Sequence, residues 1–328
     1  MICGNEQLNA TSISQFYMSG MLGYINGKLS INSMSAQYFI MQGVYSIFGI
    51  IGYVNGSSID AINIYIQMQT ENNQTGQYYG AFSGFLCADL QLISNLTIEN
   101  SIITASACVG LVAVITSQIS IQNIRISSSQ MFSTSTSASI SAFSGSIFAE
   151  TQGQISIQCS TIHNMSIYSY AVNMWAISSG VIGDSHTSPI TIQQTKVSQS
   201  TVQAFGSQIR CVTGSALLGF LYNASVQLQN TYVNNINLST SSSIVDVYCS
   251  GYMSAIFNTS IKIINSKVTS ITILASGART QIGIIISNND ALNTLVLNGV
   301  STEGTNMINL SVIGNCAQVI NTYSQSGC

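Results

Sequence analysis

Three residues in the middle of the chain, Glu150, Asp184 and His186, are of types that could perform acid–base chemistry on a polysaccharide. Cleavage of a glycosidic bond needs carboxyl groups that converge on one face, usually with a basic side chain nearby. The two carboxylates follow similar apolar segments in successive repeats, so stacked strands would bring them about 5 Å apart. The alternative, which the sequence favours, makes Asp184 a turn residue and His186 an exposed loop residue before Pro189.

Other catalytic, metal-binding and cofactor-binding patterns are missing from the sequence. The two histidines, His163 and His186, are too few for a histidine-based metal centre, and His163 suits an outward position on a strand. The glycines lie inside apolar segments rather than in a phosphate-binding loop. We therefore expect no cofactor and no metal, and a chain that is not an enzyme.

The eight cysteines contain no C-x-x-C pair of the kind that binds zinc. Cys211 and Cys249 precede the central residues of successive apolar repeats by 8 and 6 residues, so stacking could bring them close enough for a disulfide. The alternative is that both are buried thiols that act as small apolar core residues. A disulfide would indicate an oxidising compartment.

A short apolar segment with a small central residue recurs along the whole chain. Successive central residues are 29 to 39 positions apart, and a ninth repeat lies near Ile285. The first eight are Gly23, Gly52, Gly84, Ala113, Gly145, Gly180, Gly219 and Ala255. Segments in which apolar and polar residues alternate strictly follow each of them, for example 119–121 and 261–263.

This alternation has the period of a β-strand, and helical periodicity is missing. Short strands in a repeat of this length predict a solenoid, because each coil buries its apolar face only by stacking on the next. We predict an all-β, single-stranded parallel β-helix of about nine coils with three short strands per coil. It would occupy residues 1–328 as one domain, with irregular stretches at 1–18 and 312–328, either as a whole protein or as a segment of a larger one.

Polar residues that follow the central residues by three to five positions predict the corners of the coils. Asn and Asp tolerate a left-handed backbone and can hydrogen-bond through their side chains. We expect these residues to stack as a ladder along one edge: Asn26, Asn55, Asp89, Asp184, Asn223, Asn258 and Asn288.

Three parts of the sequence resemble the GLUG-type repeats of large surface proteins. They are GMLGYING at 20–27, FGIIGYVNG at 48–56, and GFLYN at 219–223 followed by VQLQN at 226–230. Those repeats combine a Gly-apolar-apolar-Gly strand with a polar turn and an I-x-N strand. The resemblance implies an adhesin-like solenoid that is secreted or lies at the cell surface.

Charged residues are rare, with 7 basic and 10 acidic side chains and a net charge of −3 in 328 residues. The basic residues are dispersed, whereas phosphate backbones are bound by clustered Lys and Arg. We therefore expect no nucleic-acid partner. A glycan or a protein at a surface, or a second copy joined through the ends of the solenoid, fits this composition better.

Residues 38–54 are uncharged and long enough to cross a bilayer. Because their second half repeats the segment at 21–27, we predict strands there and no membrane span. The N-terminal residues show no signal peptide. If the chain is nevertheless extracellular, as the resemblance implies, nine N-x-S/T sequons could accept glycans: Asn9, Asn55, Asn73, Asn95, Asn164, Asn223, Asn237, Asn258 and Asn309.

Overall fold

The structure is a computed structural model that describes most of the chain. The described residues are 2–4, 7–10, 16–43, 46–70, 78–116, 118–136, 141–172, 174–207, 211–242, 246–276, 279–283, 287, 294–298, 301–303 and 316–320. Side chains are described mainly between residues 92 and 276. All regular elements within these ranges are strands, and they belong to one sheet.

The strands before the centre of the chain are β1 (Ile2–Gly4), β2 (Gln7–Ala10), β3 (Phe16–Gly43), β4 (Ser46–Thr70), β5 (Tyr78–Glu99), β6 (Ile102–Ala105), β7 (Cys108–Ile115), β8 (Ile119–Ser127), β9 (Gln130–Ser135), β10 (Ala142–Gly145), β11 (Phe148–Thr151), β12 (Ile155–Gln158), β13 (Thr161–His163), β14 (Ser166–Ala171) and β15 (Trp175–Ser179). Those after it are β16 (Ile182–His186), β17 (Pro189–Gln193), β18 (Lys196–Gly206), β19 (Cys211–Ser215), β20 (Leu218–Tyr222), β21 (Ser225–Gln229), β22 (Tyr232–Ser242), β23 (Asp246–Ser250), β24 (Met253–Phe257), β25 (Ser260–Ile264), β26 (Lys267–Ser276), β27 (Arg279–Gly283), β28 (Thr294–Asn298), β29 (Ser301–Glu303) and β30 (Cys316–Ile320).

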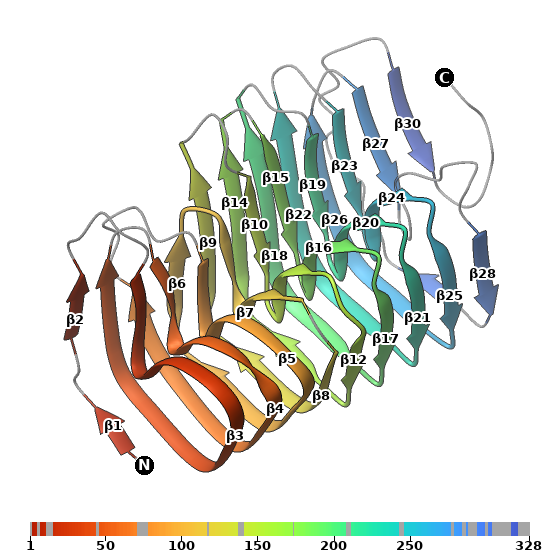
Figure 1. Cartoon of the computed structure of the whole chain (residues 1–328). Coiled ribbons are helices and arrows are strands. Elements are labelled where there is room, and N and C mark those ends of the chain that lie inside the picture. The colour runs from red at the N-terminus through yellow and green to blue at the C-terminus, as the bar shows by residue number, and fades with distance from the viewer. Residues whose placement is uncertain are drawn as a thin grey trace.

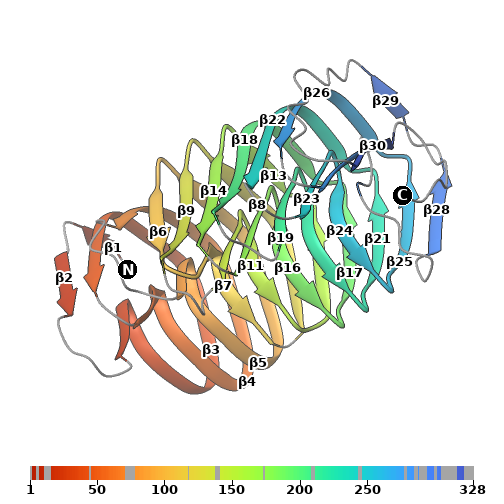
Figure 2. The same ribbon diagram turned by 90° about the horizontal axis from the view of Figure 1, so that it is seen from above.

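Strands in the middle of the chain pair in parallel with the equivalent strands one turn earlier and one turn later. Ile157, for example, lies between Ile121 on β8 and Ile192 on β17. The result is an elongated stack of coils with β1 and β2 at one end and β28–β30 at the other (Figures 1 and 2). The predicted all-β parallel solenoid is therefore confirmed.

The internal division of the coils differs from the prediction. About five turns, from Asn100 to Ser270, are described with their side chains, whereas the prediction of about nine coils was for the whole of residues 1–328. One turn carries five strands, β12 to β16, rather than three, because the chain bends at four corners between them. The stretches predicted to be irregular contain β1, β2 and β30, which pair with β3 and β27.

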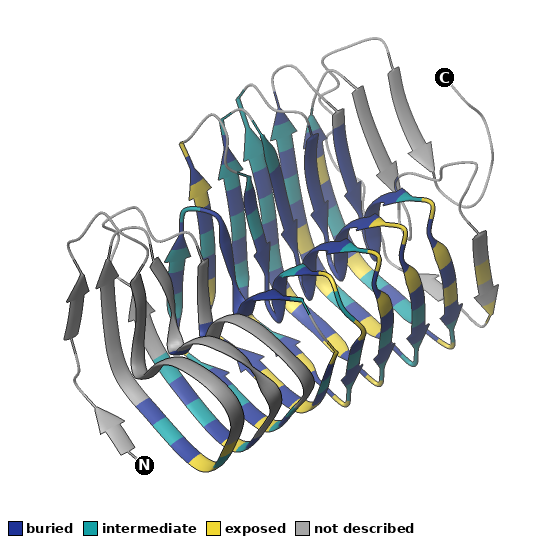
Figure 3. Cartoon of the chain, in the orientation of Figure 1, coloured by how far each residue is buried: buried dark blue, intermediate teal, exposed yellow. Residues whose placement is uncertain are grey.

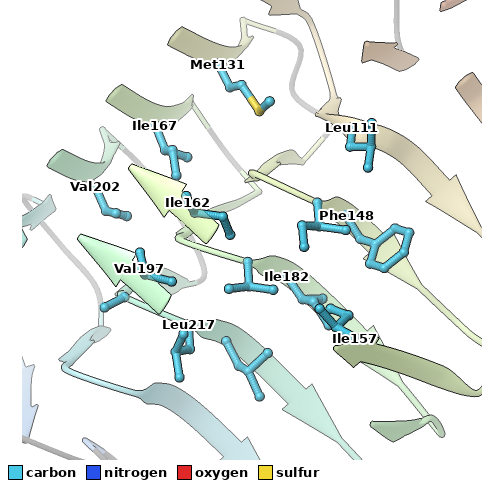
Figure 4. Close-up of a cluster of buried hydrophobic side chains, with 14 of the residues drawn as sticks. Leu111, Met131, Phe148, Ile157, Ile162, Ile167, Ile182, Val197, Val202 and Leu217 are labelled. Atoms are coloured by element: carbon cyan, nitrogen blue, oxygen red, sulfur yellow. The ribbon is translucent and has the colours of Figure 1, made fainter. Parts of the chain in front are cut away.

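The core consists of identical or similar apolar side chains stacked in rows along the solenoid (Figure 4). Burial alternates along strands such as β12 and β14, whose inward residues are buried and whose outward residues are partly exposed (Figure 3). Other strands, such as β7 and β19, are buried along their whole length. Burying one such Ile or Val stabilises the fold by roughly 1.5–3 kcal/mol. Since a single coil has no second layer of its own, this stabilisation exists only between neighbouring coils.

Residues with a left-handed backbone mark the corners. Cys159, Gln194, Asn230 and Asn265 occupy one corner of successive coils with φ between 47° and 51°. The next residue in each case is a buried Ser or Thr whose hydroxyl donates to the carbonyl oxygen two positions back, at 2.9 to 3.5 Å. The Ser160 and Ser266 hydroxyls also accept hydrogen bonds from backbone N–H groups of the preceding coil, those of Ile124 and Thr231. This corner pattern gives the buried Ser and Thr residues at these positions a structural role.

The row of small central residues is partly different from the predicted one. The pairing of the neighbouring residues places five of the predicted central residues in one row: Gly23, Gly52, Gly84, Ala113 and Gly219. Ala149 and Gly183 occupy this row in place of the predicted Gly145 and Gly180, and Ser254 in place of Ala255. A Cβ at Gly219 would meet the backbone oxygen of Gly183, so close approach of adjacent coils selects small residues here.

The predicted ladder is only partly formed. Asn26 pairs with Asn55, and the Asn258 amide donates to the Asn223 oxygen at 2.5 Å. Asp184 was wrongly included, because it pairs with Phe220 in a different row and is buried. The side chain of Asp89 and the whole of Asn288 lie outside the described residues.

A longer amide ladder, which the sequence analysis missed, runs through Asn32, Asn63, Asn95 and Asn123. The Nδ2 atoms of Asn63, Asn95 and Asn123 each donate to the Oδ1 of the Asn on the preceding coil, at 3.4, 3.1 and 2.6 Å. Three of the four Asn residues have φ between 52° and 58°. Their spacing of 28 to 32 residues was visible in the sequence and could have revealed them.

Residues 38–43 and 46–54 lie in β3 and β4, as predicted for strands. Among the described residues, no helix has the length and apolar character needed to cross a membrane.

Candidate functional site

Two parts of the sheet meet at an inner angle of the solenoid. One part contains β10, β15, β19 and β23, and the other contains β11, β16, β20 and β24 (Figure 1). Outward side chains of both parts contact each other there and form a hydrophobic cluster separate from the main core. Its members include Ile177 and Cys211 from the first part and Phe220 and Ala255 from the second.

The two predicted carboxylates lie at this angle on adjacent coils. Glu150 on β11 pairs in register with Asp184 on β16, so strand stacking places their Cα atoms about 4.8 Å apart. Asp184 is 4% exposed, and its Oδ2 lies 3.1 Å from His186 Nε2. The structure therefore brings together all three residues that the sequence singled out for acid–base chemistry.

Burial dominates the electrostatics of this group. It raises the pKa of Asp184, an effect that the hydrogen bond and charge of His186 and the Ser185 backbone oppose. Burial also raises the pKa of Glu150, and the neighbouring Asp184 charge adds to it. The hydrogen bond that His186 donates to Asp184 raises the pKa of His186. Asp184 Oδ1 has no hydrogen-bond partner among the described residues, which adds to the cost of ionising this carboxyl.

Aromatic side chains lie beside Asp184 and His186. The Trp175 ring meets Phe220 edge-on, with centroids 4.6 Å apart, and Phe220 lies 5.4 Å from Phe257. His186 lies 5.7 Å from Phe220 and 5.9 Å from Tyr222, which is 45% exposed. We call this group the acid–aromatic cluster: Glu150, Trp175, Asp184, His186, Phe220, Tyr222 and Phe257.

Cys108 extends the acid–aromatic cluster toward the first of the described turns. Its Sγ lies 4.0 Å from Glu150 Oε2. Burial, with the charges of Glu150 and Asp184, holds the pKa of the Cys108 thiol well above its usual value, so the thiol stays protonated. Across the described part of the chain, no three His, Cys, Asp or Glu side chains are arranged to hold a metal ion.

The proposed disulfide does not form. Cys211 pairs with Asp246, whereas Cys249 pairs with Gly214, so the two cysteines are offset by three residues along their strands. An odd offset also turns their side chains toward opposite faces of the sheet. Both cysteines are buried and are not disulfide-bonded, and Cys249 belongs to the main core. The alternative reading as small core residues is the one that the structure supports.

The remaining predicted positions lie on the surface. His163 is half-buried on β13, and its Nδ1 lies 3.1 Å from the Ser198 hydroxyl. Five sequon asparagines are described with their side chains: Asn95, Asn164, Asn223, Asn237 and Asn258 are all exposed. The side chains of Asn9 and Asn55 and the whole of Asn73 and Asn309 lie outside the described residues.

Comparison of the chain with protein-family models, with curated proteins and with solved structures found no match.

Proposed function

We propose that this chain is a non-catalytic, adhesin-like repeat solenoid that serves a structural or binding role outside the cell or at its surface. The supporting observation is the outer face of β8, β12, β17 and β21, where one glutamine row repeats coil after coil: Gln122, Gln158, Gln193 and Gln229. The Gln193 amide donates to Gln229 at 3.5 Å. A regular, uncharged surface of this kind suits contact with an extended partner such as a glycan.

The resemblance to GLUG-type repeats agrees with this proposal. It rests on 20–27, 48–56 and 219–230, and at Gly219 the glycine is required by the close approach of the neighbouring coil. The partner in the proposal is a glycan or a protein at a surface, or a second copy of the chain. If the chain is secreted, the five exposed sequon asparagines are available for glycosylation.

A carbohydrate-active enzyme on the same fold is the second candidate. It is favoured by the register of Glu150 and Asp184, by their raised pKa values and by the aromatic side chains beside them. The burial of Asp184 speaks against it, because a substrate would have to reach a carboxyl that is 4% exposed. A binding role needs no such access.

The two candidates differ in what the full chain does to polysaccharides. We expect the chain to be retained by at least one polysaccharide in affinity electrophoresis, with no new reducing ends or unsaturated products after prolonged incubation. Glu150→Gln and Asp184→Asn should leave that retention unchanged. Cleavage that either substitution abolishes would refute the non-catalytic role and establish the enzyme.

A further inference from the structure

A second group of aromatic residues lies on the outer face of another part of the solenoid. Strands β9, β14 and β18 pair in register, with Phe132 beside Tyr168 and Tyr170 beside Phe205. Met131, Ile167 and Val202, in the row before Phe132 and Tyr168, are buried in the core and at most 1% exposed. The four aromatic side chains therefore point outward, and all are partly exposed. We call them the aromatic strip: Phe132, Tyr168, Tyr170 and Phe205.

The rings of the strip form a continuous surface across three coils. The centroids of Phe132 and Tyr168 are 6.1 Å apart, and those of Tyr168 and Phe205 are 5.6 Å apart. Tyr170 lies two residues from Tyr168 on β14, so its side chain is on the same face of the sheet. Because successive coils are about 4.8 Å apart, the strip runs along the solenoid axis for roughly 10 Å.

The described strand segments of the sheet face that carries the strip contain no charged residue. None of the described residues in 102–105, 130–136, 166–172, 200–207, 236–242 and 271–276 is Asp, Glu, Lys or Arg. The outward row beside the strip consists of side chains that carry only amides and hydroxyls: Gln130, Ser166, Thr201, Asn237 and Thr272. This sheet face thus combines flat aromatic surface with neutral donors and acceptors.

We propose that the aromatic strip binds a neutral polysaccharide, whose sugar rings lie along the solenoid axis. An uncharged sugar ring has an apolar C–H face that packs on aromatic rings, and its hydroxyls hydrogen-bond to amides and hydroxyls like those of the adjacent row. An anionic or cationic ligand would find no opposite charge on this face. This inference rests on the proposed binding role and names its site and ligand class.

The competing explanation is purely structural, since aromatic pairs across strands also stabilise sheets. The two explanations separate when binding and stability are measured on the same variants. The full chain is titrated by calorimetry with neutral probes (xyloglucan, mannan and cello-oligosaccharides) and with charged ones (polygalacturonate and chitosan). Thermal unfolding of each variant is recorded in parallel.

We expect the wild type to bind at least one neutral probe and neither charged one. Tyr168→Ala should weaken that binding about tenfold, because it removes the central ring, whereas Tyr168→Phe, which keeps the ring, should stay within about threefold. The matched control Tyr232→Ala removes an exposed tyrosine outside the strip and should bind as the wild type does. If Tyr168→Ala lowers the melting temperature, the binding test is made instead with Phe132→Ala, which removes a ring of the strip on the neighbouring coil.

The inference is overturned if only charged probes bind, if no probe binds, or if neutral binding survives Tyr168→Ala and Phe132→Ala unchanged. It is equally overturned if the strip substitutions abolish self-association instead of glycan binding. Those outcomes leave the proposed non-catalytic binding role in place. Cleavage of a probe, in contrast, would refute that proposed role itself.

Discussion

Replacing Ile157 with Ala is expected to lower the free energy of unfolding by about 2–5 kcal/mol. Ile157 is 0% exposed and lies between Ile121 and Ile192 in a row of core side chains. Removing it takes away contacts with both neighbouring coils, and the stacked backbones cannot close the cavity because their spacing is fixed by hydrogen bonds. The shift of the denaturant midpoint, followed by circular dichroism, measures the loss.

The adjacent residue Ser156 provides the control. It lies on the same strand but points outward, so Ser156→Ala should change stability by no more than about 0.5 kcal/mol. Equal losses for the two substitutions would mean that the inward and outward faces are wrongly assigned. A reversed order would show that the strand is shifted by one residue, because such a slip exchanges the two faces.

Stability is expected to fall as the pH rises from about 4 to 8, and Asp184→Asn should flatten this dependence. The folded-state pKa values of Asp184 and Glu150 lie above their usual values of 3.8 and 4.5. Each carboxyl therefore contributes stability that is present below the usual value and is lost as the pH rises through the folded-state value. The pKa of His186 is also raised above 6.5, so its contribution is lost in the same direction.

The size of the effect is about 1.4 kcal/mol for each pH unit by which the folded-state pKa exceeds the unfolded one. Asp184→Asn removes the most deeply buried of these carboxyls, and Glu150→Gln should have a smaller effect of the same sign. Melting temperatures between pH 4 and 8 give the measurement. Ser156→Ala, which removes no titratable group, should leave the slope as in the wild type. A wild-type stability that rises with pH over this range would refute the assignment.

The fold class could be predicted because its determinants are local. Alternation at 119–121, 155–157 and 261–263 identifies strands, and its recurrence identifies coils. The number of strands per turn could not be predicted in this way. Corners such as Cys159 and Gln194 carry residue types that also occur inside strands, and only the backbone shows that their φ is positive.

Row assignments failed where the repeat length changes. The choice of Gly145 and Gly180 as central residues overlooked that Ala149 and Gly183 occupy the same row as Ala113. The same kind of slip placed Asp184 in the ladder and Cys211 beside Cys249. A slip of a few residues is invisible in a degenerate sequence but changes the face, since side chains alternate with a period of two.

The candidate site was accessible to sequence reasoning only in part. Glu150 and Asp184 occupy equivalent positions of adjacent repeats, so their juxtaposition follows from the repeat itself. The approach of Trp175 to Phe220 and of Cys108 to Glu150 depends on the angle between two parts of the sheet. No local pattern encodes that angle. The aromatic strip was visible only once the register of β9, β14 and β18 was known.

The register of the coils is the central claim, since the acid–aromatic cluster, the amide ladder and the aromatic strip all follow from it. Electron–electron distance measurements between spin labels test it most directly. One outward row of paired residues contains Leu92, Ser120, Ser156 and, further along the solenoid, Val296. Counted in coils from Val296, Leu92 is six coils away, Ser120 five and Ser156 four. Labels carried by a genetically encoded amino acid avoid the exposed native thiol of Cys159.

Labels paired with Val296 should give distances of about 29, 24 and 19 Å for Leu92, Ser120 and Ser156, one strand spacing of about 4.8 Å per coil. Distances that decrease in these equal steps would establish the stacked register. Distances that do not follow the order of the coils, or that change by much more than one strand spacing from one coil to the next, would contradict it.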